Sequence, residues 1–420
     1  MKMDIWNAVQ QYMPLLIEMR RYFHCHPELS WKEDHTMAYI EKRLDEFGIS
    51  YHLIEKGGIL GHIDGTAPGK TLLIRADMDA LPIDETDHNL SQPRVCRSSV
   101  PGVMHACGHD GHMAMQLIVA KLLQNLRHQW DGTVLILFEQ GEEDSHAMEY
   151  IVPYLERTLT QKIDCAYATH VRWDVPTGKI AILDPSPMAG GFRFRIALHG
   201  KGGHGSRPDL AYNPIDCFAS IHMQLQQLRL RAVSPQECLS VSVGSVHSGE
   251  LQNVIPDTLE FAGTCRFLNY DNAGAPFFNE FMGLVERECQ NYHCTYDVID
   301  MPKPLYEVHN DATCAALARN AVIASLGKEA LYDCPPWMAS ETFSILTRLY
   351  PSVLVFTGIA NEAKGTGANH HTPQFDLDED GLAYGAAAGL AFALTYLKEK
   401  PSIPFIRHDE PLEELAARNV

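Results

Sequence analysis

The chain has 420 residues, of which 45% are hydrophobic, and its mean hydropathy is −0.16. That length is too great for one small core, so we expect a globular protein with two domains and a substantial core. The 34 Lys and Arg residues against 53 Asp and Glu residues give a formal net charge of −19, which argues against nucleic acid or an anionic membrane as a partner.

Neither a membrane span nor a signal peptide is visible in the sequence. No apolar stretch approaches the length of a membrane span, and the first residues run into Glu18, Arg20 and Arg21 without a signal-peptide core. The 11 cysteines are scattered without a CxxC pair, which is typical of free thiols in a reducing compartment. These features predict a cytoplasmic protein in which most cysteines are packing residues.

The first third of the chain predicts helices and strands in alternation. Apolar residues recur at helical spacing from Met37 to Phe47, and Gly48 closes that helix. Further along we expect strands at residues 71–74, 132–138 and 165–169 and a helix at residues 113–126. The polar residues that could act as ligands follow the ends of these strands, where open α/β sheets place their sites.

The middle of the chain predicts a separate small domain in the order β-α-β-β-α-β, the ferredoxin-like split βαβ order. Its expected elements are a strand at 192–199, a helix at 213–230, strands at 239–246 and 258–267, a helix at 275–291 and a strand at 294–299. After Pro304 the α/β alternation resumes, with a helix at 311–325, a strand at 353–357 and a helix at 381–398. We therefore expect residues 188–303 to be inserted into a catalytic domain made of residues 1–187 and 304–420.

Two adjacent carboxylates, Glu142 and Glu143, follow the apolar run at residues 134–138. Like charges at the end of a strand persist only if water, a cation or a shared proton stabilises them. Metallohydrolases need one carboxylate bound to metal and an unliganded neighbour that takes a proton from water. Paired glutamates are also common at solvated helix starts, so the pair by itself leaves both interpretations open.

A cluster of candidate ligands precedes this pair, because residues 105–112 read His-Ala-Cys-Gly-His-Asp-Gly-His. His170 and His371 also lie where apolar segments give way to turn-rich ones. A lone Cys or His is usually structural, but ligands drawn from several distant segments are what a metal site on a rigid sheet requires. The sequence therefore predicts a metal centre, in which His105 and His112 are expected to be structural.

An ordered set of motifs carries a resemblance to a known family. The motifs are Arg75–Pro82, Met104–His112, Gly200–His204, Asn253–Pro256 and His371–Pro373. They resemble the aminoacylase/carboxypeptidase superfamily of dinuclear metallopeptidases, and more closely its amidohydrolase branch of hippurate hydrolases, N-acyl-amino-acid deacylases and auxin-conjugate hydrolases. The resemblance runs from about His24 to about Leu382. It implies an α/β fold, in which a mixed-sheet catalytic domain holds two metals and the inserted ferredoxin-like domain serves as lid and dimer interface.

Carried over residue by residue, the resemblance implies a site for two divalent metal ions per subunit, with Zn or Mn as the candidates. The implied metal ligands are Cys107, His109, Glu143, His170 and His371. Cys107 would bridge the two cations as a thiolate, Glu142 would be the general base, and Asp79 would orient a ligand.

The resemblance also gives the inserted domain a part in the reaction. The residue matching His204 reaches the site of the partner subunit and stabilises the developing oxyanion, which implies a homodimer or a dimer-based oligomer. The residues matching Asn253 and Arg266 line the substrate side, and an arginine there suits a free carboxylate. By itself, Arg266 could equally be a solvated charge on a strand.

The expected reaction is hydrolysis of the amide bond of N-acyl amino acids or related conjugates to a carboxylic acid and an amino acid. Glu142 would take a proton from the metal-acidified water and return it to the leaving amine. A dipeptidase or carboxypeptidase of the same superfamily is an alternative. A Cys-His nucleophilic hydrolase built on Cys107 would not need the glutamate pair, and a non-catalytic binding protein would not need a complete ligand set. The His-x-Glu and Pro-Cys-x-x-Cys pairing of zinc nucleobase deaminases is missing.

Two departures from the branch pattern concern the substrate pocket. Residues 138–143 read Phe-Glu-Gln-Gly-Glu-Glu where the branch usually has Phe-Gln-Pro-Ala-Glu-Glu, and Thr342 stands where it tends to have Asp. Asp144 and His146 then follow in place of a glycine-rich loop, so the charges next to the general base differ. Both departures leave the implied metal ligands unchanged. The motifs do not specify the acyl group or the amino acid of the substrate.

Overall fold

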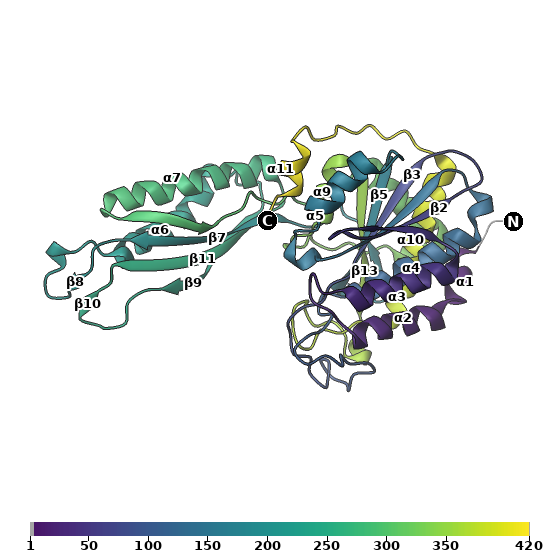
Figure 1. The fold of residues 1–420 in the computed structure, drawn as a ribbon, viewed down its shortest axis with the longest axis horizontal. Helices are drawn as coiled ribbons and strands as arrows, with labels where there is room; N and C mark the ends of the chain where they lie inside the picture. The colour runs from purple at the N-terminus through teal and green to yellow at the C-terminus, as the bar shows by residue number, and fades with distance from the viewer. Residues whose placement is uncertain (1–3, 420) are drawn as a thin grey trace. The chain divides into compact units, whose positions relative to one another are not determined.

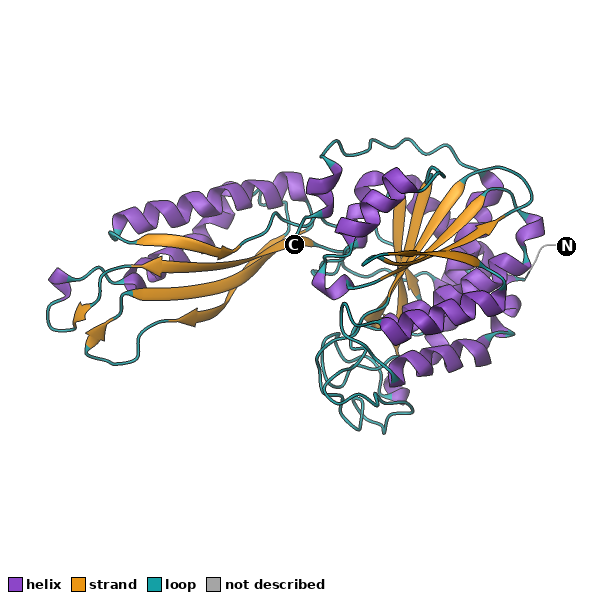
Figure 2. Ribbon diagram, viewed as in Figure 1, coloured by secondary structure: helices purple, strands orange, loops and turns teal. Residues whose placement is uncertain are grey.

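The computed structural model describes residues 4–419, which form two compact units (Figure 1). Unit 1 runs to Pro187 and includes residues 309–335 and 345–416, whereas unit 2 comprises residues 188–308, 336–344 and the chain from Ala417 onward. Both units mix helices and strands, as Figure 2 shows.

A seven-stranded mixed sheet in the order β1-β2-β4-β3-β5-β13-β6 forms the centre of unit 1. Its strands are β1 (Ser50–Ile54), β2 (Gly58–Asp64), β3 (Thr71–Asp77), β4 (Thr133–Glu139), β5 (Cys165–Pro176), β6 (Ile180–Ala181) and β13 (Ser352–Ala360). The central strands β4, β3, β5 and β13 run parallel. Strands of this kind are buried on both faces and need nearly continuous apolar runs, and residues 134–138 of β4 are such a run, fully buried.

Helices lie on both sides of this sheet, with α4 and α10 on one side and α5 on the other (Figure 1). The helices are α1 (Ile5–Gln10), α2 (Met13–Cys25), α3 (Asp34–Phe47), α4 (His109–Asn125), α5 (Met148–Pro153), α8 (Ala312–Leu326), α9 (Phe343–Leu349), α10 (Glu379–Glu399) and α11 (Leu412–Ala416). Because α4 packs between the sheet and the outer helices α2 and α3, nearly all of its residues are buried. Among the helices of residues 4–419, none combines the length and the apolar character needed to cross a membrane.

Unit 2 is a four-stranded antiparallel sheet in the order β12-β7-β11-β9, on which two helices pack. In chain order its elements are β7 (Gly190–His199), α6 (Pro214–Ala232), β9 (Leu239–His247), β11 (Thr258–Phe267), α7 (Ala275–Asn291) and β12 (Thr295–Asp300). A small separate hairpin pairs β8 (Gly203–His204) with β10 (Val254–Ile255). The β-α-β-β-α-β order and the mixed sheet of unit 1 confirm the predicted fold class.

Two elements of unit 1 differ from the sequence prediction in ways that matter for the site. Helix α4 begins at His109 instead of residue 113, so the second half of the histidine cluster lies on its first turn. Strand β5 continues to Pro176 instead of ending before His170, because it stays paired with β13 beyond that residue. His170 therefore projects from within a strand, where its backbone is fixed by hydrogen bonds on the sheet.

Candidate metal centre

Four separate segments of unit 1 supply the predicted metal ligands. Cys107 and Gly108 lead into α4, whose first residue is His109. Gly108, with a φ of 89°, allows the turn that places both side chains at the same end of the helix. Glu143 lies in the 3-10 turn Glu142–Asp144 after β4, His170 lies in β5, and His371 lies in the loop after β13.

The structure brings these five side chains together. Cys107 Sγ lies 3.6 Å from His170 Nε2, and Glu143 Oε1 lies 3.2 Å from His371 Nε2 and 3.9 Å from His109 Nε2. Donor atoms bound to one tetrahedral ion at 2.0–2.3 Å lie roughly 3.3–3.8 Å from one another. The distance between Cys107 and His170 lies within this range, and the other two distances lie close to it.

The donor atoms form two overlapping groups that share Cys107. One group consists of Cys107, His109 and His170, and the other of Cys107, Glu143 and His371, with the donor atoms of each within 4.8 Å of one another. A single sulfur common to both groups is what a thiolate bridging two cations requires.

In two of the histidines, a hydrogen bond made by Nδ1 leaves Nε2 facing the other candidate ligands. His109 Nδ1 lies 3.1 Å from Asp79 Oδ1, and His170 Nδ1 donates to the Val171 carbonyl at 2.7 Å. A neutral ring with such a partner carries its proton on Nδ1 and its lone pair on Nε2, as metal-binding imidazoles do. Burial, together with the neighbouring His112, lowers the pKa of His170 well below its ordinary value, which keeps that ring neutral.

Asp79 holds two of the predicted ligands in place. Its Oδ1 accepts from His109, and its Oδ2 accepts from the Glu143 N–H at 3.0 Å and from Ser30 Oγ at 2.7 Å. Burial alone would raise the pKa of Asp79, but the hydrogen bond from His109 and these other donors lower it below the ordinary value. The carboxylate is therefore ionised and acts as a fixed acceptor behind the ligands.

The Cys107 thiol and the buried polar atoms around it are groups that a bound cation would stabilise. Burial and the nearby Glu143 carboxylate raise the pKa of the Cys107 thiol well above its ordinary value, so a thiolate there needs positive charge beside it. Within the described residues, His109 Nε2 and Glu143 Oε1 are buried and make no hydrogen bond. Buried polar atoms are normally satisfied, and divalent cations between these donors would satisfy both.

His112, which was predicted to be structural, lies beside the donor groups and groups with Asp77 and His109. Its Nε2 accepts from the Val171 N–H at 2.8 Å and its Nδ1 lies 2.6 Å from Asp77 Oδ1, so both ring nitrogens are engaged. Asp77 also accepts from Arg75 at 2.7 Å, and Arg75 donates to Glu139 at 2.6 Å. Asp77 was not among the predicted site residues. It ends the buried strand β3, and a carboxylate in that position can indicate a functional site.

A segment after α2 holds the turn that carries Glu142. The Glu33 carboxylate accepts from the Gly141 N–H at 2.8 Å, and Trp31 Nε1 donates to Asp144 at 2.6 Å. Burial raises the pKa of Glu33 to about 7. Glu142 itself is 9% exposed, and its carboxylate groups with His109 and Glu143 but is in neither group that contains Cys107. No sequence motif identified Trp31 or Glu33 as supports of this turn.

His204 and Asn253 lie side by side on the small hairpin of unit 2. The glycine-rich run at residues 200–205 is held by pairing of β8 with β10 and by a 2.8 Å hydrogen bond from the Gly205 N–H to the Asn253 carbonyl. The His204 ring is exposed, and its Nδ1 accepts from the Ser206 N–H at 3.1 Å. The proton of the neutral ring is then on Nε2, available for donation.

Arg266 lies far from this hairpin within unit 2. It pairs with Gly191 near the start of β7, whereas the hairpin follows the other end of the sheet, where Thr258 pairs with His199. Eight residues of antiparallel strand separate these positions, or about 27 Å. Arg266 donates to Ser340, and no carboxylate of the described residues forms an ion pair with it.

Three comparisons show which known proteins this chain is similar to. Residues 73–395 match the family model for peptidase family M20/M25/M40. The chain is 32% identical over 395 residues to IAA-amino acid hydrolase ILR1-like 2 of Arabidopsis thaliana, covering 92% of this chain and 86% of that protein. It is also 32% identical to thermostable carboxypeptidase 2 of Saccharolobus solfataricus, covering 93% of this chain and 97% of that protein.

A solved structure is similar over almost the whole length. It is the YXEP protein of Bacillus subtilis, described as a dinuclear metal binding peptidase of the M20 family. It superposes with a TM-score of 0.77 at 29% sequence identity, covering 93% of this chain and 99% of that one. These matches agree with the resemblance that the ordered motifs carry.

Proposed function

We propose that this chain, which belongs to peptidase family M20/M25/M40 and is an enzyme acting on amide bonds, hydrolyses N-acyl amino acids or related amino-acid conjugates. The products would be a carboxylic acid and an amino acid. The observation that carries the proposal is the pair of donor groups sharing Cys107, with the Glu142 carboxylate next to them.

The proposed cofactor is a pair of divalent cations in each subunit, held by Cys107, His109, Glu143, His170 and His371. When bound, such cations acidify a water molecule and polarise the acyl oxygen of the substrate. Zn or Mn is proposed, because a thiolate favours the softer ion while imidazole and carboxylate ligands also accept Mn.

Glu142 is the proposed general base. It lies beside Glu143 and close to His109, and it is in neither donor group that contains Cys107, so a carboxylate that is not one of the proposed ligands lies next to them. It would accept a proton from the attacking water and deliver it to the nitrogen of the leaving amine. Asp79 would keep His109 and the Glu143 backbone in place while this happens, as its hydrogen bonds to both support.

Arg266 is proposed to select substrates that carry a free carboxylate. Its guanidinium lacks an ion-pair partner among the described residues, and burial lowers its pKa because the charged form loses solvation. A planar guanidinium can bind a carboxylate through two parallel hydrogen bonds, which recovers that loss. The free carboxylate of an N-acyl amino acid fits this requirement, whereas a simple amide does not.

His204 is proposed to act in the site of a second subunit, with Asn253 beside it on the substrate side. The exposed Nε2–H of His204 suits donation to the oxyanion that develops on the acyl oxygen. Because the hairpin that carries His204 follows the end of the unit 2 sheet that lies about 27 Å from Arg266, one chain cannot direct both residues at a single small substrate. Two subunits of a dimer can do so, and β9, an exposed edge strand, offers a surface for association.

A dipeptidase or carboxypeptidase activity is the second candidate. One relative at 32% identity bears the name thermostable carboxypeptidase 2, and the same metal chemistry cleaves either class of amide. The two activities differ in whether the group on the acyl side of the scissile bond carries an amine.

A substrate panel separates these candidates. Metal-loaded protein would be incubated with N-acetyl and N-benzoyl amino acids, with dipeptides of the same C-terminal residue, and with N-acyl amino-acid amides that lack the carboxylate. Mass spectrometry would follow the products, with Glu142→Gln protein as the control. We expect the N-acyl amino acids to be cleaved fastest and the amides slowest. Faster cleavage of the dipeptides would favour the second candidate.

A further inference from the structure

Two cysteines outside the metal centre lie close together in unit 1. Cys25 Sγ, at the end of α2, lies 2.9 Å from Cys96 Sγ in the loop that precedes α4. Other cysteine pairs are wider and buried, with 3.7 Å between Cys165 and Cys314 and 4.0 Å between Cys217 and Cys289. Cys25 and Cys96, by contrast, are both partly exposed.

Hydrogen bonds hold the backbones around the two cysteines next to each other. The Ser99 N–H donates to the Cys25 carbonyl at 2.9 Å, and the Cys96 thiol donates to the Arg21 carbonyl at 3.5 Å. The loop and the helix end are thereby fixed next to each other on both sides of the sulfur pair. Two cysteines can form a disulfide only if their backbones are suitably placed. Because these backbones already hold the two sulfurs 2.9 Å apart, a bond between them needs only a small adjustment of the side chains.

We propose that Cys25 and Cys96 form a redox modification site at which a peroxide converts the two thiols into a disulfide. The Cys25 thiol releases its proton and its sulfur attacks one peroxide oxygen. The O–O bond breaks and the departing hydroxide takes up a proton, so the products are a sulfenic acid and water. Cys96 then loses its proton and attacks the Cys25 sulfur, the S–O bond breaks, and the sulfenic hydroxyl leaves with that proton as a second water. Two thiols are oxidised by two electrons, and hydrogen peroxide is reduced to water.

The order of attack follows from the surroundings of Cys96. The Cys96 thiol donates to the Arg21 carbonyl, and burial and the adjacent thiol raise the pKa of Cys96 above its ordinary value, so Cys96 is the poorer first nucleophile. Cys25 therefore reacts with the peroxide, and Cys96 resolves the product.

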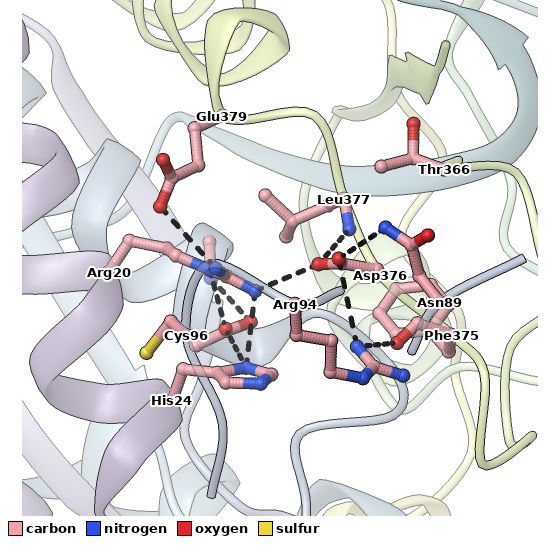
Figure 3. A network of polar contacts seen from close by, with 12 residues as sticks. Arg20, His24, Asn89, Arg94, Cys96, Thr366, Phe375, Asp376, Leu377 and Glu379 are labelled. Carbon is pink, nitrogen blue, oxygen red and sulfur yellow. Dashed lines mark hydrogen bonds and ion pairs between the residues drawn. The ribbon is translucent and has the colours of Figure 1, made fainter. Parts of the chain in front are cut away.

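The disulfide would connect to a network of charged residues (Figure 3). Cys25 follows His24, whose Nε2 lies 2.8 Å from Glu85 and whose Nδ1 lies 2.8 Å from Asp110. Arg94, on the same loop as Cys96, lies 3.1 Å from Glu85. A covalent bond at this point fixes the loop to α2, and because the cysteines are 71 positions apart it also restricts the unfolded chain.

Peptide mapping of the full-length protein tests the proposal. The reduced protein would be treated with hydrogen peroxide, its remaining thiols alkylated, and its non-reduced digest analysed by mass spectrometry. We expect a peptide pair that links Cys25 to Cys96 and disappears on reduction by a dithiol. The oxidised protein should also melt a few degrees higher than the reduced one, since the bond closes a long loop.

Two variants and one internal marker make the outcome decisive. Cys25→Ser should lose both the linked peptide and the melting shift, whereas Cys334→Ser, which removes another partly exposed thiol, should keep both. Cys238 is exposed and reports that the peroxide has reached the protein. If Cys238 is oxidised while Cys25 and Cys96 remain alkylatable, or if either is linked to a different cysteine, the proposal is wrong.

Discussion

At the scale of single residues, the hydrogen bonds behind the candidate ligands decide which atoms face the metals. Asp79 and the Val171 carbonyl each engage the Nδ1 of a histidine and so leave Nε2 of His109 and His170 toward Cys107. His112 differs from these two histidines, because its Nε2 already accepts from a backbone N–H. The roles of these residues depend on their neighbours as much as on their own chemistry.

The general-base role predicts that Glu142→Gln retains metal but loses turnover. A carboxamide cannot accept the proton of the attacking water, and removal of a general base costs about 100-fold to 10000-fold. Turnover of an N-acyl amino acid and metal content by elemental analysis would be measured on the same sample. Glu149→Gln makes the same chemical change nearby and should be close to wild type. If Glu142→Gln keeps more than about a tenth of the activity at equal metal content, Glu142 is not the base.

The positioning role of Asp79 predicts weaker metal binding in Asp79→Asn. The amide still has the shape of the carboxylate but has lost the charge that holds the proton on His109 Nδ1, and such changes cost about 10-fold to 100-fold in affinity. Competition with a chromophoric chelator would give the dissociation constants. Ser30→Ala removes one donor to Asp79 and should have a much smaller effect. Unchanged affinity in Asp79→Asn would mean that Asp79 does not orient a ligand.

At the scale of elements, short turns at strand and helix ends place the ligands. Gly141, with a φ of 63°, turns the chain after β4, and Gly108 does the same ahead of α4. At Gly108 the space is also restricted, because an added Cβ would lie 2.3 Å from Val171 Cγ2. Helix α4 and strand β5 therefore approach each other closely at the point where Cys107 meets His170.

Gly108→Ala should destabilise the protein more than Gly102→Ala does. Both glycines have a positive φ, 89° and 75°, but the nearest atom to an added Cβ at Gly102 is 3.8 Å away. Backbone strain of about 1–2 kcal/mol is common to both variants, and overpacking against Val171 adds about 1–3 kcal/mol to Gly108→Ala. Urea unfolding of the metal-free proteins would give the free energies of unfolding. Equal losses in the two variants would show that the close approach at Val171 is unimportant.

The elements themselves were largely predictable from the sequence, whereas the supports of the site were not. Strand β11 and helix α7 have the predicted bounds, because their apolar periodicity is regular. Helix α4 was predicted to start too late, since buried histidines and an aspartate on its first turn read as loop. Trp31 and Glu33 were missed because their contacts span more than 100 residues and leave no local pattern.

At the scale of the whole molecule, the two units carry different parts of the proposed chemistry. Unit 1 holds all five candidate metal ligands, and unit 2 holds His204, Asn253 and Arg266. The order of elements in unit 2 was predictable, but the separation of His204 from Arg266 was not. Only the strand register shows that Arg266 lies at one end of the sheet while the hairpin with His204 follows the other end. That separation favours a site completed by two chains.

Mixing of inactive variants tests the shared site. Glu142→Gln and His204→Ala proteins would each be nearly inactive, and after subunit exchange some heterodimers would contain one intact site. Each such heterodimer should recover about half of the wild-type activity, because its intact site combines a working base with a working partner histidine. Exchange would be followed with a mass-tagged subunit. If subunits exchange and no activity returns, His204 acts within its own chain or has no part in the reaction.

The central claim, amide hydrolysis that depends on two cations held around Cys107, is tested most directly by metal titration. Protein stripped with a chelator would be titrated with Zn or Mn while metal binding and hydrolysis of an N-acyl amino acid are measured together. We predict no activity without metal and full activity once two ions are bound per chain. Glu142→Gln should bind the same two ions and stay inactive. Undiminished activity in the stripped protein would contradict the account and favour a nucleophilic cysteine instead.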